Sequence, residues 1–295
     1  MEVRLAEYAG FCFGVKRAVD TVYEQLKEGK TIYTYGPIVH NETVVSDLEA
    51  RGVKVLEDIE ALKALKLSKS ALNAQPGGSE IAVVIRAHGV SREIYEILEQ
   101  KGIECIDATC PFVKRIHRIV DQESTKGKHI LIVGNPGHPE VEGIKGWCNG
   151  PVTVLQSPEE AENYTPKEGE ELCIVSQTTY NYNKFQYIVE IFQKKGYNDS
   201  VVNTICNATE ERQQSAKVLA AEADVMIVIG GKHSSNSAKL YEICSRECAN
   251  TYFIQTLDDL RLELPKAVRL VGITAGASTP NKLIEEVQNY VRINF

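Results

Sequence analysis

The chain of 295 residues is long enough for two or three domains, and its 43% hydrophobic and 25% charged residues are ordinary for a globular protein. Its formal net charge of −7 argues against broad non-specific binding of nucleic acid. The longest apolar runs are too short to span a bilayer and residues 1–7 lack a signal-peptide pattern, so we expect a cytoplasmic protein with no membrane partner.

Helices and strands are expected to alternate along the whole chain. The first third predicts a helix over 15–27, a strand over 31–35, a helix over 42–50, and strands over 53–56 and 81–85, then a helix over 91–100 and a strand over 103–106. The middle third predicts a helix over 112–123, strands over 129–133, 152–155 and 172–175, a helix over 184–195 and a short strand at 201–202. The last third predicts a helix over 210–221, a strand over 225–229, a helix over 235–248, strands over 252–254 and 268–272, and a helix over 281–291.

This alternation favours an α/β fold in which small parallel sheets are flanked by helices on both faces. In such sheets ligands bind beyond the carboxyl ends of the strands, where the polar loops lie. Residues 66–79 are polar, contain Pro and Gly and fit no other part of the pattern, so we expect an exposed insertion there.

Three cysteines recur at nearly constant spacing. Cys110 follows Cys12 by 98 residues and Cys206 follows Cys110 by 96, and Val-Lys-Arg follows the first two at the same offset. A histidine comes 27 or 28 residues after each cysteine, in a Gly-rich turn. Such a period indicates three related modules, at 1–109, 110–205 and 206–295.

The three cysteines allow two interpretations. They can be buried core residues, as many cytosolic cysteines are, and we assign the other five to that class. Alternatively, three thiolates from three modules can converge on one metal centre. The chain has no Cys-x-x-Cys pair of the kind that zinc sites use, and three ligands without a fourth suit an iron–sulfur cluster with one open iron.

Polar residues in Gly-flanked loops after predicted strands form a second set of candidates. His40, His88 and His138 lie in such loops, and His233-Ser-Ser-Asn opens a predicted helix in the manner of a phosphate site. Helix capping explains these serines equally well. Glu140 is the one acid among the loops, and it can also be an ordinary first-turn glutamate that interacts with the helix dipole.

Nine motifs, in order, resemble the 4-hydroxy-3-methylbut-2-enyl diphosphate reductase family and together cover residues 10–280. They are GFCFGVKRA from Gly10, GPIVHNETVV from Gly36, RAHGVS from Arg86, DATCPFVKRIH from Asp107, GHPEVEG from Gly137, SQTT from Ser176, TICNATEERQ from Thr204, GGKHSSNS from Gly230 and ITAGASTP from Ile273. The segment 66–79 departs from the family pattern.

The resemblance implies a trefoil of three α/β modules around a [4Fe–4S] cluster, with Cys12, Cys110 and Cys206 as its ligands. It implies that Glu140 and Thr178 deliver protons, with Thr179 and Thr209 nearby. It also implies that the substrate diphosphate is bound by His40, His88, His138, Ser234, Ser235, Asn236 and Ser278. The expected reaction is the reductive removal of an allylic hydroxyl to give isopentenyl and dimethylallyl diphosphates, with ferredoxin or flavodoxin as the electron donor.

Two alternatives remain at this point. A lyase that resembles quinolinate synthase also combines three modules with a three-cysteine cluster, although the motifs do not match it. A zinc or iron–sulfur sensor would be a metal module without enzymatic activity, and it would not need Glu140 and Thr178.

Overall fold

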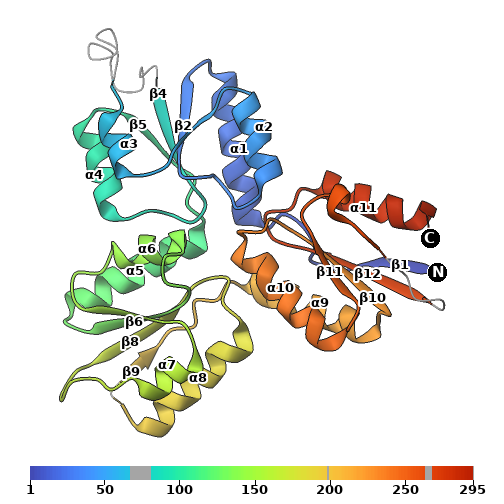
Figure 1. The fold of residues 1–295 in the computed structure, drawn as a ribbon. Coiled ribbons are helices and arrows are strands. Elements are labelled where there is room, and N and C mark those ends of the chain that lie inside the picture. Colours follow the sequence, from blue (N-terminus) through green and yellow to red (C-terminus); the bar gives the residue numbers. More distant parts are fainter. Residues whose placement is uncertain (67–80, 198, 263–267, 295) are drawn as a thin grey trace. The chain divides into compact units, whose positions relative to one another are not determined.

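The computed structural model, drawn in Figure 1, describes residues 1–66, 81–197, 199–262 and 268–294. These residues group into two compact units. The first unit contains Met1–Val15, His40–Val44 and Cys206–Phe295, and the second contains Lys16–Val39 and Val45–Ile205. The insertion predicted at 66–79 lies, apart from Lys66, outside the described residues.

The second unit holds two four-stranded parallel sheets. The strand order is β3-β2-β4-β5 in one sheet and β7-β6-β8-β9 in the other. The strands are β2 (Thr31–Tyr35), β3 (Lys54–Leu56), β4 (Ile81–Ile85), β5 (Glu104–Asp107), β6 (His129–Val133), β7 (Val152–Leu155), β8 (Leu172–Ser176) and β9 (Asp199–Val201). Its helices are α3 (Ile59–Ala64), α4 (Arg92–Gln100), α5 (Pro111–Thr125), α6 (Pro139–Lys145), α7 (Pro158–Asn163) and α8 (Tyr182–Lys195), with most of α1 (Phe13–Lys27) and α2 (Glu42–Ala50).

Helices cover both faces of the sheet built around β6. Leu131 and Val133 pack in one core with residues of α7 and α8, whereas Ile130 and Ile132 pack in another with residues of α5 and α6 (Figure 1). Because alternate residues of β6 are buried on opposite faces, the strand is apolar from Ile130 to Val133, after its first residue, His129. The same physics makes β4 a continuous apolar run.

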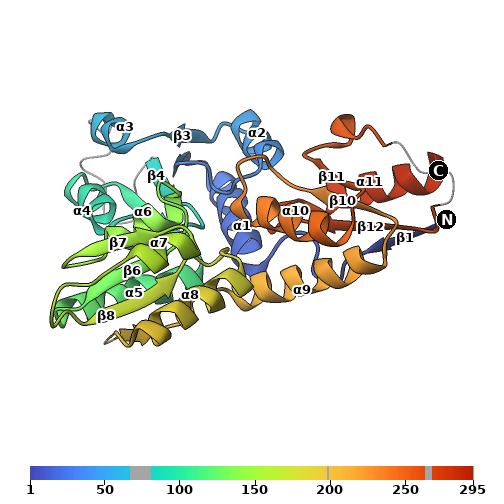
Figure 2. The same ribbon diagram turned by 60° about the horizontal axis from the view of Figure 1, so that its bottom comes forward.

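The first unit holds one sheet of the same kind, in the order β1-β12-β10-β11. Its elements are β1 (Glu2–Leu5), α9 (Asn207–Glu222), β10 (Val225–Ile229), α10 (Ser235–Glu247), β11 (Thr251–Ile254), the 3₁₀ turn η2 (Leu257–Asp259), β12 (Leu270–Ala275) and α11 (Asn281–Asn294). Residues of α11 pack on one face of the sheet, and residues of α9 and α10 pack on the other (Figure 2).

One edge strand of each sheet comes just before one of the three periodic cysteines in the chain. Strand β5 precedes Cys110 and β9 precedes Cys206, whereas β1 precedes Cys12 and completes the sheet of the first unit. Backbone pairing joins Glu2 to Leu270 and Leu5 to Ile273. The third repeat of the fold therefore takes its last strand from the start of the chain.

The predicted fold class, parallel sheets flanked by helices, is confirmed in each described sheet. The boundaries 1–109, 110–205 and 206–295 stay a prediction, to which the structure adds that β1 pairs within the sheet of the third range. The strand expected at 268–272 lies instead at Leu270–Ala275. Among the described residues, no helix is long and apolar enough to cross a membrane.

Candidate functional site

A buried carboxylate lies at the carboxyl ends of two neighbouring strands in the second unit. Glu140 is in the first turn of α6, just beyond β6, and Thr178 follows β8, which pairs with β6. The backbone N–H of Thr178 donates to Glu140 Oε1 at 2.6 Å, and the Thr178 hydroxyl donates to Oε2 at 2.7 Å. Both side chains are buried, so this pair is shielded from water.

Burial raises the pKa of Glu140 to about 7, although both hydrogen bonds from Thr178 lower it. The carboxyl group therefore exists in both protonation states near neutral pH. A general acid works best when its pKa lies close to the working pH. Glu140 is thus suited to donate a proton, and the Thr178 hydroxyl can both donate and accept one.

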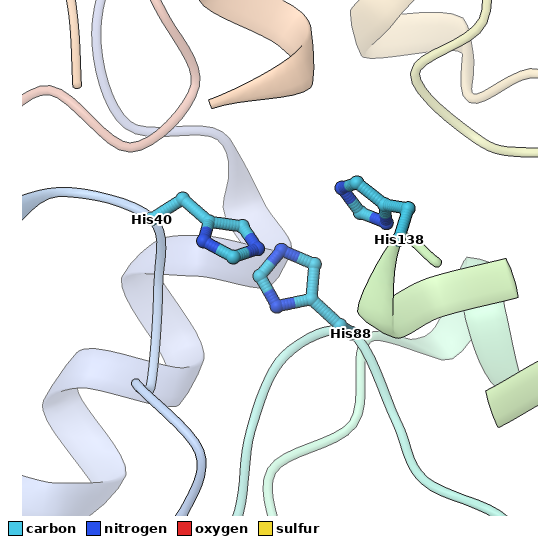
Figure 3. Close-up of side chains that lie close together, drawn as sticks. All are labelled: His40, His88 and His138. Atoms are coloured by element: carbon cyan, nitrogen blue, oxygen red, sulfur yellow. The ribbon is translucent and has the colours of Figure 1, made fainter. Parts of the chain in front are cut away.

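His138 is fixed by the same turn of α6. It occupies the N-cap position, and its Nδ1 accepts the backbone N–H of Glu140 at 3.1 Å. Since Nδ1 is the acceptor, the proton of the neutral ring sits on Nε2, which makes that atom a donor. The ring of His88, from the loop after β4, lies edge to face with it at a centroid distance of 5.5 Å (Figure 3).

One residue that supports this site was not predicted from the sequence. The backbone N–H of Gln177 donates to the carbonyl of Val133, and its Oε1 accepts the N–H of Asn135. Its Nε2 donates to the hydroxyl of Thr179 at 3.1 Å. Gln177 therefore ties together the loops after β6 and β8, which carry Glu140 and Thr178. The only sequence signal is its place within the SQTT motif.

In the first unit, the start of α10 presents a buried amide without a partner. Ser234 is the N-cap, and its hydroxyl accepts the N–H of Ser237, so helix capping accounts for this serine. Asn236 is only 3% exposed, yet neither its Oδ1 nor its Nδ2 has a hydrogen-bond partner in the described part of the chain. Since buried polar groups are almost always satisfied, this amide is suited to a ligand.

The loop that carries His40 packs closely against the loop before α10. A Cβ atom added to Gly231 would lie 2.6 Å from the His40 carbonyl oxygen, so only glycine fits there. That carbonyl also accepts the hydroxyl of Ser278 at 3.0 Å. Three of the predicted substrate-binding loops, those of His40, Ser234 and Ser278, thus meet within the first unit.

Each periodic cysteine stands immediately before a helix. Cys110 and Cys206 are the N-cap residues of α5 and α9, and Cys12 precedes α1. The backbone N–H of Cys12 donates to the carbonyl of Ala277, and that of Cys110 donates to the carbonyl of Ala87. Thr209, three residues after Cys206, is buried in the first turn of α9. The N-terminus of a helix favours a nearby negative charge, so these positions suit cysteines that bind a metal as thiolates.

This environment fits a metal centre bound through thiolates. Within the second unit, the structure brings together His88, His138, Glu140 and Thr178. Within the first, Cys12 and Cys206 both interact electrostatically with the buried Arg212. That Cys110 joins Cys12 and Cys206 in one centre remains a prediction.

The chain matches the family described as LytB protein over residues 3–292. A relative from Caldanaerobacter subterraneus subsp. tengcongensis, named 4-hydroxy-3-methylbut-2-enyl diphosphate reductase, is 48% identical over 97% of this chain and 95% of its own. A Thermoanaerobacter relative (strain X514) of the same name is 45% identical over 99% and 97% of the two chains.

Two solved structures are similar over nearly the full length. The E-1-hydroxy-2-methyl-but-2-enyl-4-diphosphate reductase from Plasmodium falciparum superposes with a TM-score of 0.84 at 30% identity, over 99% of this chain and 87% of its own. A structure of (E)-4-hydroxy-3-methyl-but-2-enyl diphosphate reductase, described as the terminal enzyme of the non-mevalonate pathway, has a TM-score of 0.67 at 42% identity, over 99% and 100% of the two chains.

Proposed function

Since this chain belongs to the LytB protein family of 4-hydroxy-3-methylbut-2-enyl diphosphate reductases, we propose that the residues described above carry out that terminal reaction of the non-mevalonate pathway. The substrate is an allylic alcohol that carries a diphosphate. Two electrons and two protons replace its hydroxyl by hydrogen and release water. Protonation at either end of the allylic system gives isopentenyl or dimethylallyl diphosphate.

The family cofactor is an iron–sulfur cluster, and we assign its ligands to Cys12, Cys110 and Cys206. Their support is the module period together with their places at helix N-termini. When bound, a [4Fe–4S] cluster with three cysteine ligands supplies single electrons and one open, Lewis-acidic iron. The chain's own residues must then bind the diphosphate, exclude water and supply protons.

Proton delivery is assigned to Glu140 with Thr178, and the geometry of this pair is the observation that carries the proposal. Hydroxide is a poor leaving group, so an acid must protonate the oxygen as the C–O bond breaks. Glu140 is buried, its pKa is raised to about 7, and the hydroxyl of Thr178 contacts its Oε2. The Thr178 hydroxyl can therefore pass the proton of Glu140 to the substrate oxygen.

The diphosphate is assigned to hydrogen-bond donors in loops at strand ends and at helix starts. The Nε2–H of His138 and the unpartnered amide of Asn236 support this role most directly. The other residues assigned to the diphosphate are His40, His88, Ser234, Ser235 and Ser278, whereas Thr179 and Thr209 are assigned to support the proton-delivery pair. Backbone N–H groups at the start of α10 add to the attraction for an anion.

A one-electron carrier is the assigned partner, either a ferredoxin or a flavodoxin. The cluster takes up electrons singly, and the sequence has no flavin or nicotinamide fingerprint.

The test is anaerobic purification followed by iron and sulfide analysis and by turnover of the allylic diphosphate with a chemical reductant. We expect about four irons and four sulfides per chain, the composition of a [4Fe–4S] cluster, together with isopentenyl and dimethylallyl diphosphates as products. A zinc-containing protein without turnover would contradict the proposal.

A further inference from the structure

Arg212 is a buried cation on α9, six residues after Cys206. Its side chain is 3% exposed. Nη1 donates to the carbonyl of Gly10 at 2.8 Å and to the carbonyl of Ala275 at 3.2 Å. The guanidinium therefore joins the segment just before Cys12 to the end of β12.

The segment held by Arg212 has little freedom to move. Gly10 has a positive φ of 93°, and a Cβ atom there would lie 2.8 Å from Asn281 Oδ1 and 2.9 Å from Ile284 Cδ1. The backbone N–H of Gly10 also donates to the carbonyl of Ala275, and the backbone N–H of Cys12 donates to the carbonyl of Ala277. The hydrogen bonds of Arg212 thus complete a tight backbone setting for Cys12.

Among the described residues, no carboxylate balances the charge of Arg212. In the described part of the chain it forms no ion pair with a carboxylate, and its buried Nε has no hydrogen-bond partner. Burial lowers its pKa, and the charges that oppose this lowering are those of Cys12 and Cys206. A buried cation is costly unless an anion lies close to it, and these two cysteines supply that charge when they bind a metal as thiolates.

We propose that Arg212 is the buried counter-charge of the iron–sulfur centre, a positioning residue that holds Cys12 in place and favours uptake of an electron by the centre. The proposal rests on the assigned function. Each added electron makes a thiolate-bound cluster more negative, and a fixed positive charge nearby stabilises the reduced form more than the oxidised form. In a buried setting this effect is weakly screened by salt.

The experiment compares the cluster-loaded proteins Arg212→Gln, Arg212→Lys and Arg246→Gln by spectroelectrochemical titration, with iron content and far-UV circular dichroism as further readouts. Arg246 is the matched control because it is exposed on α10, where it pairs with Glu242. Gln removes the charge but keeps a donor, whereas Lys keeps the charge. We expect Arg212→Gln to lower the midpoint potential of the cluster by at least about 59 mV, which is a tenfold decrease in the equilibrium constant for one-electron reduction.

Arg212→Lys should lower the midpoint potential by less than half as much as Arg212→Gln does. Arg246→Gln should have the midpoint potential of the wild type. If Arg212→Gln cannot hold a cluster but Arg212→Lys can, the need for the charge is equally supported. An unchanged midpoint potential in Arg212→Gln overturns the proposal. So does failure of both Arg212 variants to fold or to load iron, because the hydrogen bonds rather than the charge are then essential. Wild-type iron content and turnover test the assigned function separately.

Discussion

Thr178 makes two hydrogen bonds to Glu140, one from its backbone N–H and one from its hydroxyl, each to a different carboxylate oxygen. The backbone bond fixes the carboxylate in place, and the hydroxyl bond provides a path for a proton. The two residues are 38 positions apart in the chain, and the pairing of β6 with β8 brings their loops together.

Replacing Glu140 by Gln should slow turnover at least about a hundredfold, because a general acid typically contributes 10²–10⁴-fold. The wild-type rate should also fall as the pH rises through about 7, where the acid form of Glu140 is lost, and this limb should be absent in the variant. Steady-state reduction with a chemical donor over pH 5–9 measures both effects. Glu142→Gln is the control, since Glu142 is exposed on the same helix and pairs with Lys145. Near-normal turnover of Glu140→Gln would make Glu140 a helix-dipole residue.

Thr178→Val should cause a smaller loss of rate and move the alkaline limb to higher pH. The hydroxyl of Thr178 lowers the pKa of Glu140 by stabilising the carboxylate, so its removal raises that pKa further. The backbone N–H bond remains in the variant. The same pH–rate profile measures the shift, and a limb displaced to lower pH would show that the hydroxyl stabilises the acid instead.

Glu140 should also make the folded state less stable as the pH rises. Its pKa is raised from 4.5 to about 7 in the folded protein, so the folded state binds the proton more tightly than the unfolded state does. The stability contribution of Glu140 is therefore fully present below pH 4.5 and is lost by the time the pH has risen through 7. The expected loss is up to roughly 3 kcal/mol. Denaturant unfolding of wild type and Glu140→Gln at pH 5 and pH 8 gives this difference; equal pH dependence in the two proteins would contradict the burial argument.

Cys12→Ser, Cys110→Ser and Cys206→Ser should each lose the normal cluster, whereas Cys148→Ser and Cys105→Ser should keep it. Only the first three stand at helix N-termini on the module period. Iron and sulfide content with the visible absorption spectrum is the readout. A full loss in Cys148→Ser would show that the period selects the wrong thiols.

Asn236→Ala should weaken the binding of inorganic diphosphate about tenfold or more, since a hydrogen bond to a charged group contributes about 1.5–3 kcal/mol. It should change the unfolding free energy little, because this amide has no partner in the described part of the protein to lose. Asn149→Ala should lower the unfolding free energy and leave the diphosphate affinity unchanged, since the side chain of Asn149 forms hydrogen bonds with Asp121 and Thr125. Calorimetry and denaturant unfolding separate the two effects. Unchanged diphosphate affinity in Asn236→Ala would remove it from the anion site.

The strands that could be predicted from the sequence are those that helices cover on both faces. The runs 81–85 and 225–229 are apolar throughout, 129–133 is apolar after His129, and each is a strand with those bounds. Strand β1 has no such pattern, because its residues are mostly exposed and it is held mainly by backbone pairing with β12 and by Val3, which packs against the core. Periodicity within a short window cannot show a partner at the other end of the chain.

The site was predictable as a set of residue types but not as a set of contacts. The module period and the motif resemblance selected Glu140, His138 and Thr178, and the structure brings these three together. The raised pKa of Glu140 could not be predicted, because it depends on burial by the surrounding loops. The relatives at 48% and 45% identity leave neither the lyase nor the sensor alternative any support.

The pairing of β1 with β12 sets an order on biosynthesis. Glu2 is made before any strand of the second unit, whereas its partner Leu270 is made after all of them. The two sheets of the second unit contain only strands from residues 31–201, so they can form while synthesis continues. Strand β1, with Cys12 just behind it, must wait for β12, so the backbone setting of Cys12 is completed only after Leu270–Ala275 has been made.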